Sequence, residues 1–105
     1  IVGATVLDLF AGTGSLGFES LSRGAEKVVA VDKGADSKKI IEKNKNLIGI
    51  EEGYEFISDE IIRFIGKEMR QFDYIFVDPP FTQKMGAEVM RALDKSSVLK
   101  PEDYF

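Results

Sequence analysis

The fold is decided by the stretch Val6-Leu7-Asp8-Leu9-Phe10-Ala11-Gly12-Thr13-Gly14-Ser15-Leu16-Gly17. Its first five residues form a short apolar run with a single acid, which predicts a buried strand. Glycines follow at once, and a helix-like pattern then runs from Ser15 to Arg23, with Gly24 where a helix commonly ends on a glycine. The face of that helix expected to be apolar carries Leu16, Ser20 and Leu21. A strand, a glycine turn and a helix are therefore expected in immediate succession.

The same alternation continues along the rest of the chain. Further strands are expected at Val28–Val31, Tyr54–Ile57 and Tyr74–Val77, and helices at Asp36–Ile48, Glu60–Met69 and Gly86–Leu93. The side chains expected to face inward from these helices are Ile40, Ile41, Leu47 and Ile48, then Ile61, Ile62, Ile65 and Met69, then Val89, Met90 and Leu93. Continuous apolar strands that alternate with helices are typical of a parallel sheet covered on both faces. The sequence thus predicts an α/β, doubly wound, Rossmann-like, mostly parallel sheet with strand order 3-2-1-4.

The composition narrows the possible chemistry. The chain has 105 residues, a formal charge of −4, no cysteine and no histidine. It therefore has no disulfide, no thiolate nucleophile and no imidazole base, and no metal site is expected. No basic and apolar leader is visible, so a cytoplasmic protein is expected.

The fourth predicted strand is apolar, and another strand-like stretch begins at Tyr104. An apolar strand at the edge of a sheet is prone to aggregation. Residues 1–105 are therefore expected to be part of a longer domain.

The glycine turn is a candidate ligand site. Glycines let the backbone approach a ligand closely, and the helix that follows offers free N–H groups at its positive end. The run Gly12–Gly17 matches the dinucleotide pattern G-x-G-x-x-G, and Asp32 lies 18 residues after Gly14. Asp8, four residues before Gly12, would repel a pyrophosphate but suits a cationic ligand. That charge favours S-adenosylmethionine (SAM) over NAD, although an NAD-dependent oxidoreductase that uses Gly12, Gly14 and Gly17 stays open.

Two acids end the second and third predicted strands. Asp32 can accept hydrogen bonds from both hydroxyls of a ribose, and the adjacent Lys33 is counted with it as a cofactor-binding candidate. Asp59 can accept from an adenine amino group, or it is simply the N-cap of the next helix. The lysines at positions 38, 39, 43 and 45 are interpreted as a solvated helix face rather than as a phosphate-binding surface.

The string Asp78-Pro79-Pro80-Phe81 follows the fourth strand. Two prolines fix the backbone and remove two donors, so the turn is rigid and extended. The Asp78 carboxylate and the Pro79 carbonyl offer two acceptors, and Phe81 offers an aromatic face on which a base can stack, worth roughly 1–3 kcal/mol. These are the groups that an exocyclic amino group on a flat base requires.

Together these motifs resemble class I SAM-dependent amino-methyltransferases. The resemblance is strongest to the bacterial 16S ribosomal-RNA guanine-N2 methyltransferases, and it rests on Asp8–Gly17, Asp32, Ser58-Asp59, Asp78–Phe81 and Ser22-Arg23-Gly24-Ala25. It implies that residues 1–105 form one partial methyltransferase domain of a seven-stranded fold, without its last strands and its N-terminal extension.

The resemblance also implies roles for individual residues. Asp8, Phe10, Ala11, Gly12, Thr13 and Gly14 would face the methionine part of SAM, Asp32 the ribose and Asp59 the adenine. Asp78, Pro79, Pro80 and Phe81 would hold the amino group that is methylated. The implied substrate is guanine N2 in 16S ribosomal RNA, with the small ribosomal subunit as partner. Adenine N6 in DNA, a protein glutamine, and a non-catalytic SAM-binding fragment remain alternatives.

Overall fold

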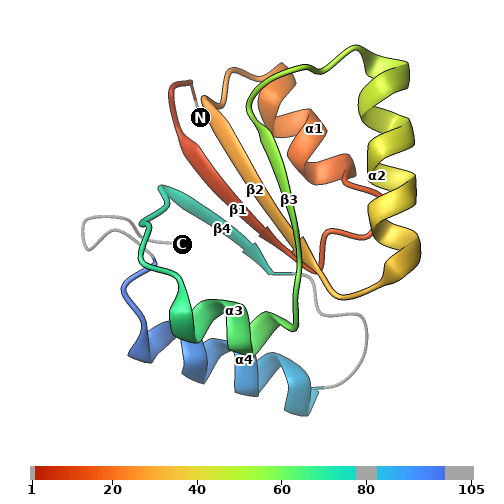
Figure 1. Ribbon diagram of the computed structural model, residues 1–105. Helices are drawn as coiled ribbons and strands as arrows, with labels where there is room; N and C mark the ends of the chain where they lie inside the picture. Colours follow the sequence, from red (N-terminus) through yellow and green to blue (C-terminus); the bar gives the residue numbers. More distant parts are fainter. Residues whose placement is uncertain (1, 78–82, 99–105) are drawn as a thin grey trace.

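The computed structural model describes residues 2–77 and 83–98. Strands and helices alternate along the chain, and all four strands belong to one parallel sheet in the order β3-β2-β1-β4. The bounds are β1 Thr5–Leu9, α1 Ser15–Ser22, β2 Lys27–Asp32, α2 Ala35–Ile48, β3 Tyr54–Ser58, α3 Ile61–Lys67, β4 Tyr74–Val77 and α4 Gln83–Lys95 (Figure 1). The predicted fold class and strand order are confirmed. The strand expected near Tyr104 lies outside the described residues.

The helices cover both faces of the sheet. In Figure 1, α1 and α2 lie on one face and α3 and α4 on the other. Within β1, Val6 packs with the α1–α2 side, whereas Leu7 and Leu9 pack with the α3–α4 side. Because each face of the sheet is buried, the strands can be apolar at nearly every position, and this is the pattern that the sequence shows.

The strand register gathers the functional turns at one edge. Leu9, at the end of β1, pairs with Val31 of β2 and with Val77 of β4. Asp32 pairs with Ser58, the last residue of β3. The segments that follow β1, β2 and β3 therefore leave the sheet side by side, at the carboxyl edge where ligands of such folds bind.

The buried faces of α1 and α2 match those predicted only in part. In α1, the predicted Ser20 is buried and the predicted Leu21 packs against the core, whereas Leu16 is 46% exposed. Gly17 and Phe18, which were not predicted, also face the sheet. In α2 only Ile41 is buried among the four expected residues, and Ile40, Leu47 and Ile48 are exposed. The periodicity identified the helix correctly. However, α2 packs on β3, which is the edge strand of the described sheet, so only a narrow strip of the helix is covered.

The inward faces of α3 and α4 are partly as predicted. Ile61 and Ile65 of α3 and Val89 of α4 are buried, and Leu93 packs against the same cluster. Ile62, Met69 and Met90 are exposed, and the buried Phe64 was missed. The helix was expected to reach Met69, but α3 ends at Lys67, so Met69 is not part of a helix.

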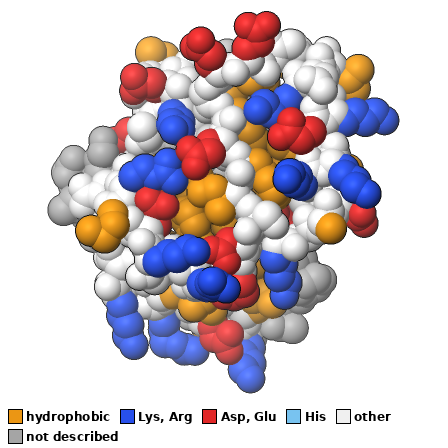
Figure 2. Space-filling model, viewed as in Figure 1, with side chains coloured by type: hydrophobic (Ala, Val, Ile, Leu, Met, Phe, Trp, Pro, Cys, Tyr) orange, Lys and Arg blue, Asp and Glu red, His pale blue; other side chains and the backbone are white. Residues whose placement is uncertain are grey.

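Charged side chains of both signs are interspersed over the face shown in Figure 2, with apolar side chains visible between them. None of the helices within residues 2–77 and 83–98 combines the length and the apolarity that crossing a membrane would need.

Candidate functional site

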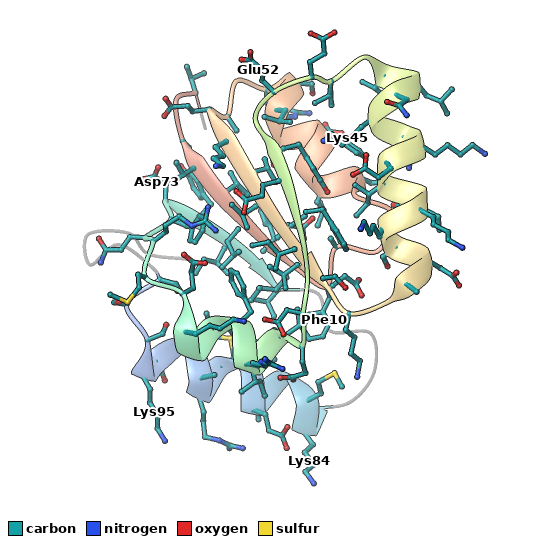
Figure 3. All side chains as sticks on the ribbon, in the orientation of Figure 1. Phe10, Lys45, Glu52, Asp73, Lys84 and Lys95 are labelled. Atoms are coloured by element: carbon teal, nitrogen blue, oxygen red, sulfur yellow. The ribbon has the colours of Figure 1, made fainter. Side chains whose placement is uncertain are left out.

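The turn after β1 begins with a strained residue. Phe10 has φ 64°, and within the described part of the chain it is the one non-glycine residue with a positive φ. The left-handed conformation costs roughly 1–2 kcal/mol for a residue with a Cβ. The N–H groups of Phe10 and Ala11 both donate to the carbonyl of Val31, at 3.0 and 3.2 Å, which fixes the start of the turn on β2. Figure 3 shows Phe10 at the carboxyl edge of the sheet, where it packs against the apolar cluster on the α3–α4 side.

The Asp32 carboxylate joins two turns. Its Oδ2 accepts from the N–H of Gly12 at 2.9 Å, and its Oδ1 accepts from the N–H of Gly34 at 3.0 Å. One side chain therefore ties the turn after β1 to the turn after β2. Each carboxylate oxygen has two lone pairs, so each can still accept a further hydrogen bond from a ligand.

The three glycines of the turn have different surroundings. A Cβ added to Gly12, which has φ 58°, would meet nothing within 4 Å, so this backbone is open to a ligand. A Cβ on Gly14 would lie 2.8 Å from the Tyr54 Oη, and one on Gly17 would lie 2.6 Å from the Tyr54 Cε2. The second and third glycines therefore serve the packing of α1 on β3, and Gly12 alone offers open backbone.

Hydrogen bonds fix the rest of the turn. The Gly14 N–H donates to the Ala11 carbonyl at 2.9 Å, and the Thr13 carbonyl accepts from the Asn44 side chain at 3.1 Å. The Thr13 and Ser15 hydroxyls lie 2.8 Å apart. Gly14 is the N-cap of α1, and no side chain caps this helix. The first N–H groups of α1 therefore have no side-chain acceptor, which suits an anionic ligand group.

A cavity of about 490 Å³ opens beside this turn, within the range typical of small-molecule sites. Four predicted residues line it, namely Phe10, Gly12, Asp32 and Lys33. The sequence reasoning missed the other lining residues, which are Gly34, Glu60, Ile61, Ile62, Met85, Glu88 and Val89. For Glu60 to Ile62 the available signal was their place directly after the third strand.

A second hollow, of about 400 Å³, is lined by Thr5, Glu26, Lys27, Gly53, Tyr54 and Glu55. Thr5 and Lys27 begin β1 and β2, so this hollow lies at the amino edge of the sheet. Ligands of open α/β sheets bind at the carboxyl edge. We therefore assign the candidate site to the cavity beside the glycine turn.

Asp8 lies beneath the turn. It is 2% exposed, and along β1 it alternates with Leu7 and Leu9, so it faces the α1–α2 side with Val6. Burial raises the pKa of the Tyr54 hydroxyl, and the Asp8 charge raises it further. Asp8 therefore sits near Tyr54, behind Gly14, and is not among the residues that line the cavity. Its role toward the methionine part of SAM stays a prediction.

Asp59 is engaged by two cations of α3. Its carboxylate lies 3.0 Å from the Lys67 Nζ and 3.9 Å from the Arg63 Nε, and the hydrogen bond from Lys67 is the main cause of its lowered pKa. The N-cap of α3 is Glu60, whose side chain accepts from the N–H groups of Ile62 and Arg63. The N-cap alternative for Asp59 was therefore wrong by one residue. Its role toward adenine stays a prediction.

Asp78, Pro79, Pro80 and Phe81 lie outside the described residues. The strand that leads into them ends at Val77, which pairs with Leu9. β4 thus ends at the sheet edge from which the glycine turn also leaves.

Comparison with known proteins identifies the family. A family model described as "Conserved hypothetical protein 95" matches residues 1–105. The chain is 37% identical over 98 residues to ribosomal RNA small subunit methyltransferase D of Haemophilus influenzae, covering 90% of this chain and 51% of that protein. It is 33% identical over 104 residues to the protein of the same name in Escherichia coli K12, covering 97% and 51%. The chain spans about half the length of these curated relatives.

Solved structures agree with this relationship. A putative methyltransferase of Escherichia coli superposes with a TM-score of 0.88 at 27% identity, over 97% of this chain and 57% of that one. A putative methylase of Haemophilus influenzae gives 0.85 at 34% identity, over 96% and 65%. A more distant putative methyltransferase, solved with S-adenosylhomocysteine (SAH), shares the fold at 0.79 and 18% identity, over 94% and 29%. The chain therefore belongs to the family described as Conserved hypothetical protein 95, and its fold is that of the class I methyltransferases.

Proposed function

We propose that this chain carries the cofactor site of a SAM-dependent methyltransferase that acts on ribosomal RNA. The observation that carries the proposal is the Asp32 carboxylate, which joins the two turns, lines the cavity and keeps lone pairs for a ligand. The names of the relatives support a ribosomal RNA substrate. The residue set also fits the cofactor, because open backbone at Gly12, an acid and an apolar wall meet in one place.

Individual residues divide the task of holding the cofactor. Asp32 would accept from the ribose hydroxyls, and Phe10 and Ile62 would supply apolar contact for a flat ring. The backbone from Phe10 to Gly14 would face the methionine part, with Asp8 behind it contributing negative charge. Bound SAM supplies a methyl group carried on a positively charged sulfur. Asp59 is kept as a candidate for the adenine amino group, and its neighbour Glu60 lines the cavity.

The motif Asp78–Phe81 is proposed to hold the target amino group. The Asp78 carboxylate and the Pro79 carbonyl would accept from its two N–H bonds, while Phe81 would stack on the base. Acceptors on both N–H bonds draw the nitrogen lone pair out of conjugation with the ring. Orientation of well-placed reactants can contribute about 7–11 kcal/mol. As the nitrogen forms its bond to the methyl group and the bond from sulfur to that methyl breaks, the nitrogen becomes a strongly acidic cation that can release its proton to water, so no histidine base is required. The finer proposal, guanine N2 in 16S ribosomal RNA, rests on the family resemblance.

Transfer of a labelled methyl group to RNA of the small ribosomal subunit tests this function. The protein should methylate RNA from a strain in which its own gene is deleted, and nucleoside mass spectrometry should identify N2-methylguanosine. Asp78→Ala should abolish transfer while the affinity for SAH, measured by calorimetry, stays within about twofold. DNA and protein are offered in parallel reactions, and transfer of label to DNA adenine or to a protein glutamine but not to RNA would overturn the substrate assignment. Binding of NADH without binding of SAH would overturn the cofactor assignment.

A further inference from the structure

We propose that Asn44 of α2 is a positioning residue that holds the glycine turn in its ligand-ready conformation. Its Nδ2 donates to the Thr13 carbonyl at 3.1 Å, across 31 positions of sequence. Asn44 does not line the cavity, so it acts on a ligand only through the turn. The expected effect of Asn44 on ligand affinity rests on the proposed function. The hydrogen bond itself joins two parts of this chain and does not depend on a ligand.

The helix that carries Asn44 is fixed on the same side. Ile41, three residues earlier, is fully buried, and its Cγ1 would lie 3.1 Å from a Cβ built on Gly14. Lys45, four residues after Ile41, places its Nζ 3.5 Å from the Tyr54 carbonyl on β3. Residues three and four apart share one face of a helix. This face of α2 therefore touches both the turn and β3, and it brings Asn44 to Thr13.

Asn44 complements the contact made by Asp32. Asp32 supplies an acceptor for the Gly12 N–H, and Asn44 supplies a donor for the carbonyl of the next residue, Thr13. The peptide between Thr13 and Gly14 thus has both of its polar groups bonded, since the Gly14 N–H donates to Ala11. Two side chains from different elements therefore set the orientation of two peptide groups in the glycine turn, the one before Gly12 and the one after Thr13.

The expected consequence is preorganisation. Glycine-containing turns have many accessible backbone conformations, and a ligand that must select one of them binds more weakly. Without the Asn44 donor the peptide after Thr13 is free to reorient. We expect the affinity for SAH to fall about tenfold, and KM for SAM to rise while kcat stays nearly constant, because Asn44 makes no contact with the reacting groups.

Asn44→Asp tests the donor with almost no change in shape. A carboxylate cannot donate, so it would face the Thr13 carbonyl as a second acceptor. Asn46→Asp is the matched control, because Asn46 is exposed on the same helix and receives the same charge. Asn44→Gln retains the donor on a longer side chain and should recover part of the affinity. Two measurements are made on each variant: calorimetry with SAH, and amide hydrogen exchange at residues 12–14 without ligand.

Faster exchange confined to residues 12–14 in Asn44→Asp, with about tenfold weaker SAH binding and partial recovery in Asn44→Gln, would support the proposal. Unchanged exchange in Asn44→Asp, or equal effects in Asn46→Asp, would overturn it. Faster exchange throughout the core would also overturn it, because Asn44 would then be a general structural residue. If the wild-type protein failed to bind SAH, the proposed function would fail, and the exchange measurement would still decide whether Asn44 holds the turn.

Discussion

At the scale of single residues, Asp32 combines a structural contact with a proposed role in binding the ligand. The sequence pointed to it as a ribose acceptor, and the structure adds that both of its oxygens already accept backbone N–H groups. Hydrogen bonds to a charged acceptor contribute about 1.5–3 kcal/mol each. Loss of the charge should therefore affect the shape of the site as well as its affinity.

Asp32→Asn should weaken SAH binding by at least tenfold and also lower the free energy of unfolding by about 1–3 kcal/mol. The amide keeps the shape of the carboxylate but presents an N–H group to one of two backbone donors. Calorimetry and urea denaturation measure the two effects. Asp36→Asn, in the exposed first turn of α2, is the control and should change both by little. Unchanged SAH affinity in Asp32→Asn would remove Asp32 from the site.

Tyr54 is a second residue whose surroundings predict a measurable effect. Its ring stacks on Phe18 at 4.6 Å, and its buried hydroxyl has no hydrogen-bond partner within the described residues. Burial, and then the charge of Asp8, raises its pKa above the ordinary value near 10. The protonated form is thus favoured in the folded state, so this contribution to stability is complete below pH 10 and is lost as the pH rises above it.

Tyr54→Phe should therefore be as stable as the wild type at pH 7, or up to about 1 kcal/mol more stable, because the stacked ring remains. Above pH 10 the wild type should lose stability with an additional slope of up to about 1.4 kcal/mol per pH unit, which the variant lacks. Denaturant titrations between pH 8 and pH 11 measure both. If the free energy of unfolding changed with pH in the same way in both proteins, the raised pKa of the buried Tyr54 hydroxyl would be contradicted.

At the scale of elements, the close approach of α1 to the sheet depends on Gly17. A Cβ at this position would lie 2.6 Å from Tyr54 and 2.9 Å from Val28. The helix is therefore near enough to β2 and β3 to hold the glycine turn at the carboxyl edge. Gly66, within α3, offers a natural comparison, because a Cβ added there would meet nothing within 4 Å.

Gly17→Ala and Gly66→Ala should have opposite effects. Alanine gains roughly 1 kcal/mol over glycine inside a helix, so Gly66→Ala should stabilise the protein by up to that amount. Gly17→Ala should lower the free energy of unfolding by about 1–3 kcal/mol, since α1 must move away from Tyr54 and Val28. Chemical denaturation of both variants under one condition checks the signs. A stabilised Gly17→Ala would mean that α1 is free to shift.

The strands and helices could be predicted from the sequence more fully than their buried faces or the residues of the candidate site. Alternation of apolar runs and helical repeats predicted each strand and helix found in residues 2–77 and 83–98, because these patterns are local. The buried faces were less predictable, as Leu47 shows: its spacing fits an apolar stripe, yet it is 74% exposed at the edge of the sheet. In the candidate site, Gly12 and Asp32 could be singled out from the sequence because glycine turns and strand-end acids have sequence signatures, and both line the cavity. Asn44 could not, because its contact with Thr13 depends on how α2 packs.

At the scale of the whole molecule, ion pairs join the amino edge of the sheet to the segment after α3. Arg70 contacts Glu55 of β3 at 3.1 Å and Glu68 at 2.8 Å, and Lys27 of β2 contacts Glu55 at 3.1 Å. The hydrogen bonds from Arg70 are the main cause of the lowered pKa values of Glu55 and Glu68. The two ionised glutamates stabilise the fold at pH values above the ordinary glutamate pKa, near 4.5, and this stabilisation is lost as the pH falls below it.

Arg70→Gln should lower the free energy of unfolding at pH 7 by on the order of 1 kcal/mol, because the cluster is partly exposed to solvent. The difference from the wild type should shrink below pH 4.5 and in high salt. Thermal unfolding over a matrix of pH and salt measures it. Arg23→Gln, which breaks the exposed pair with Glu19, is the control and should cost less. A difference that persisted at low pH would show that Arg70 acts through packing rather than charge.

The link that Asp32 makes between the turns after β1 and β2 has a consequence for laboratory evolution. A population selected only for resistance to heat, with no demand for catalysis, should still keep an acid at this position, since the two turns depend on it. Retention of Asp32 among such survivors would then be no sign that their chemistry had survived. Variation at Lys33, whose side chain is exposed beside it, would be the better record of whether a ligand was still being bound.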